Sequence, residues 1–176
     1  ALFHYNTSGR PGGYVDFDNY TVEEPRARGI EREIPLGKTI TLASGADGSF
    51  LVSNEEEMIV QSVNGASPHA ATPNIRFKVI DCGTGRVALQ ATNGRFASVA
   101  ADGGSVTLKQ SKAADLTDAE KFQWVNLMRG DTMLMSLTNH RYLATTPGSP
   151  GPVTVSATGP QPARKGGACF KWKVVE

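Results

Sequence analysis

Residues 86–110, RVALQATNGRFASVAADGGSVTLKQ, recur in altered form on both sides of this stretch. The preceding copy is TITLASGADGSFLVSNEEEMIVQ at 39–61, and the following copy is TMLMSLTNHRYLATTPGSPGPVTVS at 132–156. The equivalent aromatic residues Phe50, Phe96 and Tyr142 follow one another at intervals of 46 residues. A repeat of this length indicates a supersecondary unit that buries its apolar face only against its neighbours.

Within each copy, apolar residues recur at every second position. Val87 and Leu89 alternate with Ala88 and Gln90, and the other two copies follow the same pattern. A period of two places one face of a short β-strand inward. Two further strands are expected in the middle of each unit. The later of these two, which is the third strand of its unit, is expected at 58–60, 106–108 and 153–155. Each unit ends on an aromatic strand, with the sequences RFKVI (76–80), KFQWV (121–125) and CFKWKV (169–174).

Three units of four strands, separated by turns rich in Gly, Asn and Asp, predict an all-β fold. The arrangement expected for residues 37–176 is a β-trefoil, a six-stranded barrel capped by a triplet of hairpins, with the F-x-V and F-x-W residues pointing inward. Only 113–121 is expected to form a helical turn. A propeller is excluded because three units do not close around a channel, and a solenoid is the weaker alternative because no polar capping repeat is visible.

The turn sequences also carry a family resemblance. The segments NGRFA at 93–97 and NHRYLA at 139–144, each followed by a Gly-containing turn and later by F-x-W, resemble the fascin-type branch of the β-trefoils over residues 37–176. The ricin-type lectin branch is less similar, because its Q-x-W signature is replaced by F-x-V or F-x-W. Kunitz-type trefoil inhibitors usually contain paired disulfides, which two cysteines cannot supply.

The first 36 residues fall outside the repeat and differ in composition. They contain five aromatic residues around a GRPGG turn at 9–13 and are predicted to form a β-hairpin extension followed by a linker at 25–36. The sequence GGYVDFDNYTVEE at 12–24 is similar to the closing strand of the β-sandwich accessory modules of family 43 glycoside hydrolases. This resemblance implies that Ala1 is not a natural start and that a catalytic domain belongs to the same natural chain. The alternative is an N-terminal arm that belongs to the trefoil itself.

Composition limits the classes of partner. The formal net charge of +1 provides no field that would attract nucleic acid or an anionic membrane, and no apolar run approaches the length of a membrane span. Cys82 and Cys169 occupy non-equivalent positions of different repeats. They are expected to be two reduced, half-buried thiols, with a single bridge as the alternative.

No arrangement of residues predicts catalysis, a metal site or a cofactor. His4, His69 and His140 lack a carboxylate or cysteine at the spacing of a metal site or a catalytic triad. The glutamate run at 55–57 is expected to be solvated. Asp16 and Asp18 share one face of a predicted strand and supply the hard oxygen ligands that calcium prefers, although such a pair is more often the wet side of an edge strand. The chain is therefore predicted not to be an enzyme by itself.

Sugar binding is the function that the residues favour. Every aromatic residue of the trefoil occupies a repeat-equivalent position, as a core requires, so a site must be polar or must use the outer end of Tyr142. The candidate carbohydrate-binding residues are the turn residues Asp47, Asn93, Arg95, Asn139, His140, Arg141 and Tyr142. The third turn is the preferred site. Asn and Asp in such turns also serve the backbone, and this structural role stays open for each.

The resemblances specify the sugar-binding function further and leave two alternatives to it open. They imply a non-catalytic carbohydrate-binding or accessory module of a secreted, hence extracellular, bacterial enzyme that degrades plant cell-wall or similar polysaccharide. A fascin-like trefoil would instead bind a protein partner, and the shortage of spare aromatic residues also allows a structural spacer. No nucleic acid or membrane partner is expected.

Overall fold

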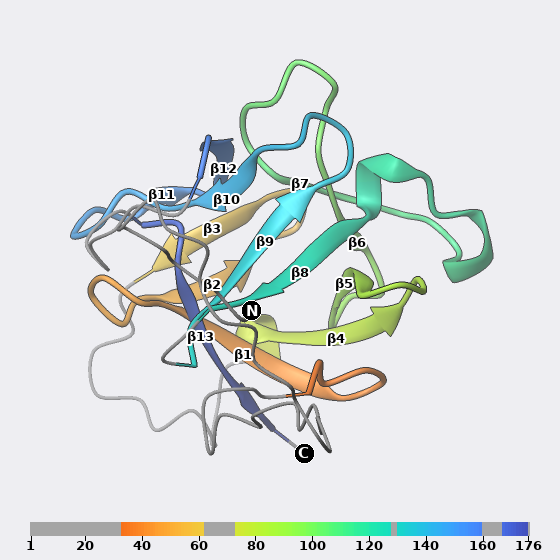
Figure 1. Ribbon diagram of the computed structural model, residues 1–176, viewed down its shortest axis with the longest axis horizontal. Helices are drawn as coiled ribbons and strands as arrows, with labels where there is room; N and C mark the ends of the chain where they lie inside the picture. Colours follow the sequence, from red (N-terminus) through yellow and green to blue (C-terminus); the bar gives the residue numbers. More distant parts are fainter. Residues whose placement is uncertain (1–32, 62–72, 128–129, 160–166, 176) are drawn as a thin grey trace, which may run out of the picture.

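Six strands form a closed barrel at the centre of the computed structural model, which describes residues 33–61, 73–127, 130–159 and 167–175. The chain pairs around this barrel in the order β1, β4, β5, β8, β9, β13 and back to β1, always antiparallel. Figure 1 shows these strands crossing one another in the middle of the molecule. Their bounds are β1 (Thr39–Ser44), β4 (Arg76–Asp81), β5 (Arg86–Ala91), β8 (Phe122–Asn126), β9 (Thr132–Ser136) and β13 (Phe170–Val174).

Each repeat adds a hairpin between its two barrel strands. The hairpins pair β2 (Phe50–Ser53) with β3 (Met58–Gln61), β6 (Phe96–Ser98) with β7 (Thr107–Lys109), and β10 (Tyr142–Ala144) with β12 (Thr154–Ala157). A short strand that the sequence did not predict, β11 (Gly151–Pro152), pairs with β3 of the first repeat. The predicted all-β trefoil of three four-stranded repeats is confirmed.

A triangle of backbone hydrogen bonds joins the three hairpins. The amide of Met58 donates to the carbonyl of Val106 (3.0 Å), that of Val106 donates to Val153 (2.8 Å), and that of Val153 donates back to Met58 (2.9 Å). All three residues are fully buried. Val106 and Val153 were expected to begin strands, but β7 begins at Thr107 and β12 at Thr154, one residue later in each case.

The closing strands fill the barrel as expected. Phe77, Phe122 and Phe170 are fully buried and belong to one core cluster. Trp124 is 5% exposed, while Trp172 is partly buried and packs against the same cluster. The two indole rings meet edge to face, with centroids 6.0 Å apart and planes at 74°. This geometry is the favourable one for an aromatic pair.

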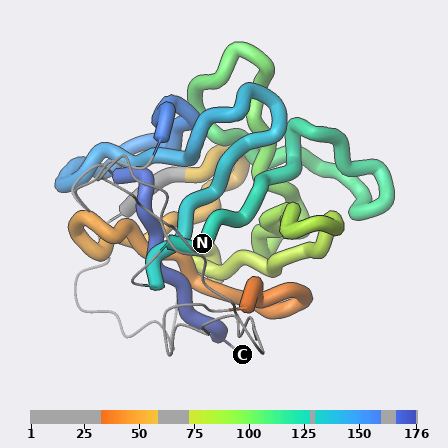
Figure 2. The backbone as a smooth tube through the Cα atoms, viewed as in Figure 1, coloured from red at the N-terminus to blue at the C-terminus, as the bar shows by residue number. Residues whose placement is uncertain are grey.

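The connection between β7 and β8 contains the predicted helical turn as two 3₁₀ segments, η2 (Ala113–Asp115) and η3 (Asp118–Glu120). Figure 2 shows this connection projecting from one side of the barrel. Glu120 anchors it, because its buried carboxylate accepts hydrogen bonds from the Ser98 hydroxyl (2.8 Å), the Thr117 hydroxyl (2.7 Å) and the Thr117 amide (3.0 Å). Burial disfavours the charged form, but these hydrogen bonds outweigh it and hold the pKa of Glu120 below its usual value of 4.5.

The structure tests some of the remaining sequence predictions, while others concern residues that it does not describe. Neither cysteine forms a disulfide, and Cys82 is half-buried, as predicted. Cys169 was also expected to be half-buried, but it is buried because it packs in an apolar cluster with Met133 and Ala168. The glutamates at 55–57 are exposed, as predicted. The prediction that only 113–121 forms a helical turn is wrong, because a further short 3₁₀ helix, η1 (Pro73–Ile75), precedes β4. The expected N-terminal hairpin, including Asp16 and Asp18, lies outside the described residues, as do His4 and His69.

Candidate functional site

The predicted sugar-binding residues lie on three equivalent turns, each between the first two strands of a repeat. In each turn one side-chain oxygen accepts a hydrogen bond from the backbone amide two residues further on. The pairs are Asp47 with Ser49 (3.0 Å), Asn93 with Arg95 (3.1 Å) and Asn139 with Arg141 (3.1 Å). The side-chain oxygen therefore shapes the turn in every repeat, which is the structural role that the sequence left open.

The turns also connect one repeat to another. The second carboxylate oxygen of Asp47 accepts a hydrogen bond from the amide of Gly148 in the third repeat (2.7 Å). The Arg95 guanidinium donates to the carbonyl of Glu55 in the first repeat (2.8 Å). Desolvation of Asp47 is outweighed by the hydrogen bonds from Gly148 and Ser49, so its pKa lies below the usual value of 3.8. Both oxygens of Asp47 are thus engaged within the protein.

The third turn leaves more side-chain groups available to a ligand. His140 and Arg141 are exposed, and Tyr142 is half-buried, with its ring packed against an apolar cluster around Met133 and Cys169. The Arg141 guanidinium makes one long hydrogen bond, to the carbonyl of Ser156 (3.3 Å). An amide, an imidazole, a guanidinium and a phenol are therefore presented within four consecutive residues, on a turn whose backbone is fixed at both ends by β9 and β10.

The structure keeps the three turns apart, one in each repeat, so it does not combine all seven predicted residues into one site. Asn93 and Arg95 belong to the second turn, Asp47 to the first, and only 139–142 form a local group. Any ligand-binding role of these residues remains a prediction.

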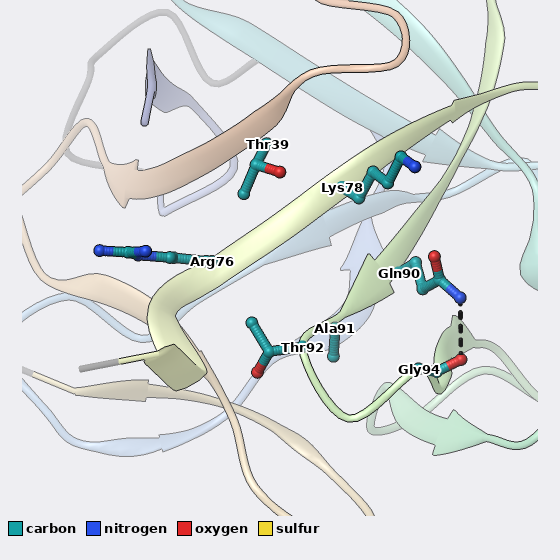
Figure 3. Close-up of a pocket in the computed structure, with 7 residues that line it drawn as sticks. All are labelled: Thr39, Arg76, Lys78, Gln90, Ala91, Thr92 and Gly94. Carbon is teal, nitrogen blue, oxygen red and sulfur yellow. Dashed lines mark hydrogen bonds between the residues drawn. The ribbon is translucent and has the colours of Figure 1, made fainter. Parts of the chain in front are cut away.

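A groove on the barrel is a feature that no sequence pattern predicted. A pocket of about 240 Å³ is lined by side chains or backbone from β1, β4, β5 and the turn after β5, and Figure 3 shows them around strand β4: Thr39, Arg76, Lys78, Gln90, Ala91, Thr92 and Gly94. A second pocket of about 380 Å³ shares three of these residues and extends to Gly37, Lys38, Val174 and Val175. We call the two together the β4 groove.

The β4 groove follows from the register of three neighbouring strands. Lys78 pairs with Thr39 on one side and with Gln90 on the other, so these side chains form a row across the sheet. Phe77 and Val79 point into the core, which turns Arg76 and Lys78 outward. In Figure 3, Arg76 and Lys78 extend in opposite directions along β4, and Gln90 donates to the carbonyl of Gly94 (3.1 Å). The alternating pattern of β4 predicted that the Arg76 and Lys78 side chains point outward, but it did not predict which strands would lie beside β4.

The described residues hold no group of three His, Cys, Asp or Glu side chains able to bind a metal ion. Among the same residues, no helix is long and apolar enough to cross a membrane. The chemistry available at the turns and at the β4 groove is hydrogen bonding and charge recognition.

Comparison with known proteins supports the fold. No family model matches the sequence, and no curated protein matches it. A designed three-fold symmetric protein, ThreeFoil, aligns with a TM-score of 0.60 over 76% of this chain and 96% of its own, at 16% identity. An exo-β-1,3-galactanase from Clostridium thermocellum aligns with a TM-score of 0.61 over 81% of this chain, at 14% identity. A lectin from Polyporus squamosus aligns with a TM-score of 0.63 over 81% of this chain, at 12% identity. This chain covers 31% of the galactanase and 50% of the lectin.

Proposed function

We propose that this protein is a non-catalytic carbohydrate-binding module that recognises a polysaccharide. The observation that carries the proposal is the third turn, where exposed His140 and Arg141 lie between Asn139 and the half-buried ring of Tyr142. Sugar hydroxyls need donors and acceptors at short spacing, and an aromatic ring can cover the apolar face of a sugar. The Asn139 oxygen accepts the turn hydrogen bond, and its amide nitrogen lies against Gly103 of the second repeat.

Two of the similar structures support this class of ligand. One is the galactanase, and the other is the Polyporus squamosus lectin bound to the epitope Neu5Acα2-6Galβ1-4GlcNAc. We extend the proposal to an accessory module of a secreted bacterial polysaccharide-degrading enzyme, with the catalytic domain on the same natural chain. That this chain aligns with only 31% of the galactanase is compatible with such an accessory role. The natural ligand would then be a plant cell-wall or similar polysaccharide outside the cell.

The binding test is an NMR titration with neutral plant cell-wall oligosaccharides, followed through backbone amide shifts. A shallow site with a few exposed hydrogen bonds should bind with a Kd on the order of 0.1–1 mM. The shifts should cluster at 139–142 and should vanish in Arg141→Ala. The matched control is Arg95→Ala, which removes the equivalent guanidinium from the second turn and should leave those shifts in place.

Three outcomes would count against the third turn. Shifts confined to the N-terminal residues 14–20 would move the sugar site there. Shifts lost equally in Arg141→Ala and Arg95→Ala would remove the preference for the third repeat. No shifts at millimolar ligand would overturn sugar binding at this turn and favour the spacer or protein-binding alternatives. Release of reducing sugar from xylan, arabinan or galactan by the purified chain would contradict the non-catalytic part of the proposal.

A further inference from the structure

We propose that the β4 groove binds the carboxylate of an acidic sugar unit, such as a uronic acid, in a polysaccharide. The proposal deepens the proposed function by naming a substrate class, and it rests on that function. It concerns a surface separate from the third turn, because no residue of 139–142 lines either pocket of the groove.

The charge of the β4 groove is the first argument. Its lining includes three cations, Lys38, Arg76 and Lys78, and no acidic residue among the described residues that form it. Arg76 and Lys78 are two positions apart on one face of β4, with about 7 Å between their backbones, and their side chains extend in opposite directions along the strand (Figure 3). They therefore present positive charge along the length of the groove. The chain as a whole carries a formal net charge of only +1, so this concentration of positive charge is local.

The Arg76 guanidinium is the second argument. Its Nε is buried and has no hydrogen-bond partner within the described part of the chain. A buried donor on a charged group loses its water without compensation, which is a substantial cost. Arg76 lines both pockets, so an anion in either could approach it. A carboxylate is a suitable partner, because its two oxygens match the planar donors of a guanidinium.

The rest of the lining favours a sugar as the carrier of the carboxylate. Thr39 and Thr92 contribute side-chain hydroxyls, and Gln90 keeps its carbonyl oxygen as an acceptor because only its amide nitrogen is used internally. Val174, 43% exposed, lines the second pocket and offers an apolar surface. Hydroxyl partners beside an apolar surface match the two kinds of face that a sugar ring presents. Among the described residues, no aromatic side chain lines either pocket to stack on a nucleotide base, which disfavours a nucleotide as the source of the anion.

The experiment compares two ligands of the same size, trigalacturonate and the neutral galactotriose, with the full chain at low ionic strength. Amide shifts at Thr39, Arg76 and Thr92 should appear with trigalacturonate and should be absent with galactotriose. The Kd for trigalacturonate should rise about tenfold or more in Arg76→Gln, as expected for loss of a charge-assisted contact. Lys78→Gln is the second variant, since Lys78 is exposed and its replacement should leave folding intact. It should weaken binding in the same direction.

The matched control is Lys112→Gln, which removes one charge from the exposed connection between β7 and β8. Equal weakening by Lys112→Gln and by both groove variants would overturn the proposal, because the effect would then be one of net charge. Sodium sulfate is the second probe. Binding of sulfate at the groove as tightly as trigalacturonate would also overturn it, since the sugar would then add nothing to the anion.

The outcomes separate this inference from the proposed function. Shifts at 139–142 with neutral oligosaccharides, but none at the β4 groove with trigalacturonate, would overturn the groove and leave the third turn as the sugar site. Groove shifts with trigalacturonate that disappear in Arg76→Gln, without any shifts at 139–142, would support the groove while contradicting the third turn.

Discussion

At the scale of single residues, the three repeats build the same turn from different side chains. An Asp or an Asn supplies the side-chain oxygen that accepts a hydrogen bond from the backbone amide two residues further on. The residue directly after the Asp or Asn adopts a left-handed backbone conformation. Gly48 and Gly94 take this conformation with φ of 78° and 82°, whereas His140 takes it with φ of 56°. A side chain in this region costs energy that glycine avoids. The third repeat therefore retains an imidazole at a position that stability alone would assign to glycine.

The cost at His140 is measurable. His140→Gly should raise the free energy of unfolding by about 0.5–1 kcal/mol, because relief of the left-handed backbone exceeds the added entropy of the unfolded chain. Urea unfolding followed by tryptophan fluorescence measures the difference. The reciprocal variant Gly94→His should lower stability by a similar amount, since a Cβ at Gly94 meets no atom within 4 Å and only the backbone is affected. Destabilisation by His140→Gly would mean that the imidazole makes a stabilising contact.

Glu120 should make stability depend on pH. Its folded-state pKa lies below 4.5, so its contribution is complete above the unfolded pKa and is lost as pH falls through the folded pKa. Glu120→Gln should lower stability by about 1.5–3 kcal/mol at pH 7, because charge-assisted hydrogen bonds are lost, and by progressively less as the pH falls below 4.5. Urea unfolding at pH 7 and over a series of acidic pH values tests this. The control Asp118→Asn removes an exposed carboxylate nearby, and an equal effect would refute the special role of Glu120.

At the scale of elements, the closing strands show what the sequence could predict. Period-two alternation and the repeated F-x-W or F-x-V pattern depend on residues close together in the chain, so barrel strands, turns and inward aromatics were predicted correctly. The asymmetry between the two tryptophans was not predictable. Trp172 pairs with Leu42 on β1 and is only partly buried, whereas Trp124 is 5% exposed, and the shared F-x-W pattern does not distinguish the two.

The two tryptophans should therefore differ in their contribution to stability. Trp124→Ala should destabilise by about 3–5 kcal/mol, the range for removing a large buried aromatic, and it also removes the hydrogen bond from Nε1 to Asn126 (2.9 Å). Trp172→Ala should cost less, about 1–3 kcal/mol, because the side chain is partly exposed. Chemical denaturation of both variants provides the comparison. An equal loss, or no loss in Trp124→Ala, would contradict the packing described for the barrel.

At the scale of the whole molecule, the structural features that the sequence did not predict depend on contacts between repeats. The backbone triangle of Met58, Val106 and Val153 and the strand β11 each join segments almost fifty residues or more apart. The β4 groove likewise combines β1, β4 and β5, and its position depends on the register in which the barrel closes. The seven predicted turn residues were located on the correct elements, but their engagement with neighbouring repeats followed only from the assembled fold.

Binding of a polysaccharide is the central claim, and affinity gel electrophoresis of the full chain tests it most directly. Native gels are cast with a soluble arabinogalactan, xylan or polygalacturonate, and mobility is compared with that in a gel without polysaccharide. We expect slower migration in at least one of these gels, with retardation that grows with polysaccharide concentration and is reduced in Arg141→Ala or Arg76→Gln. Unchanged mobility of the protein in all of them would contradict it.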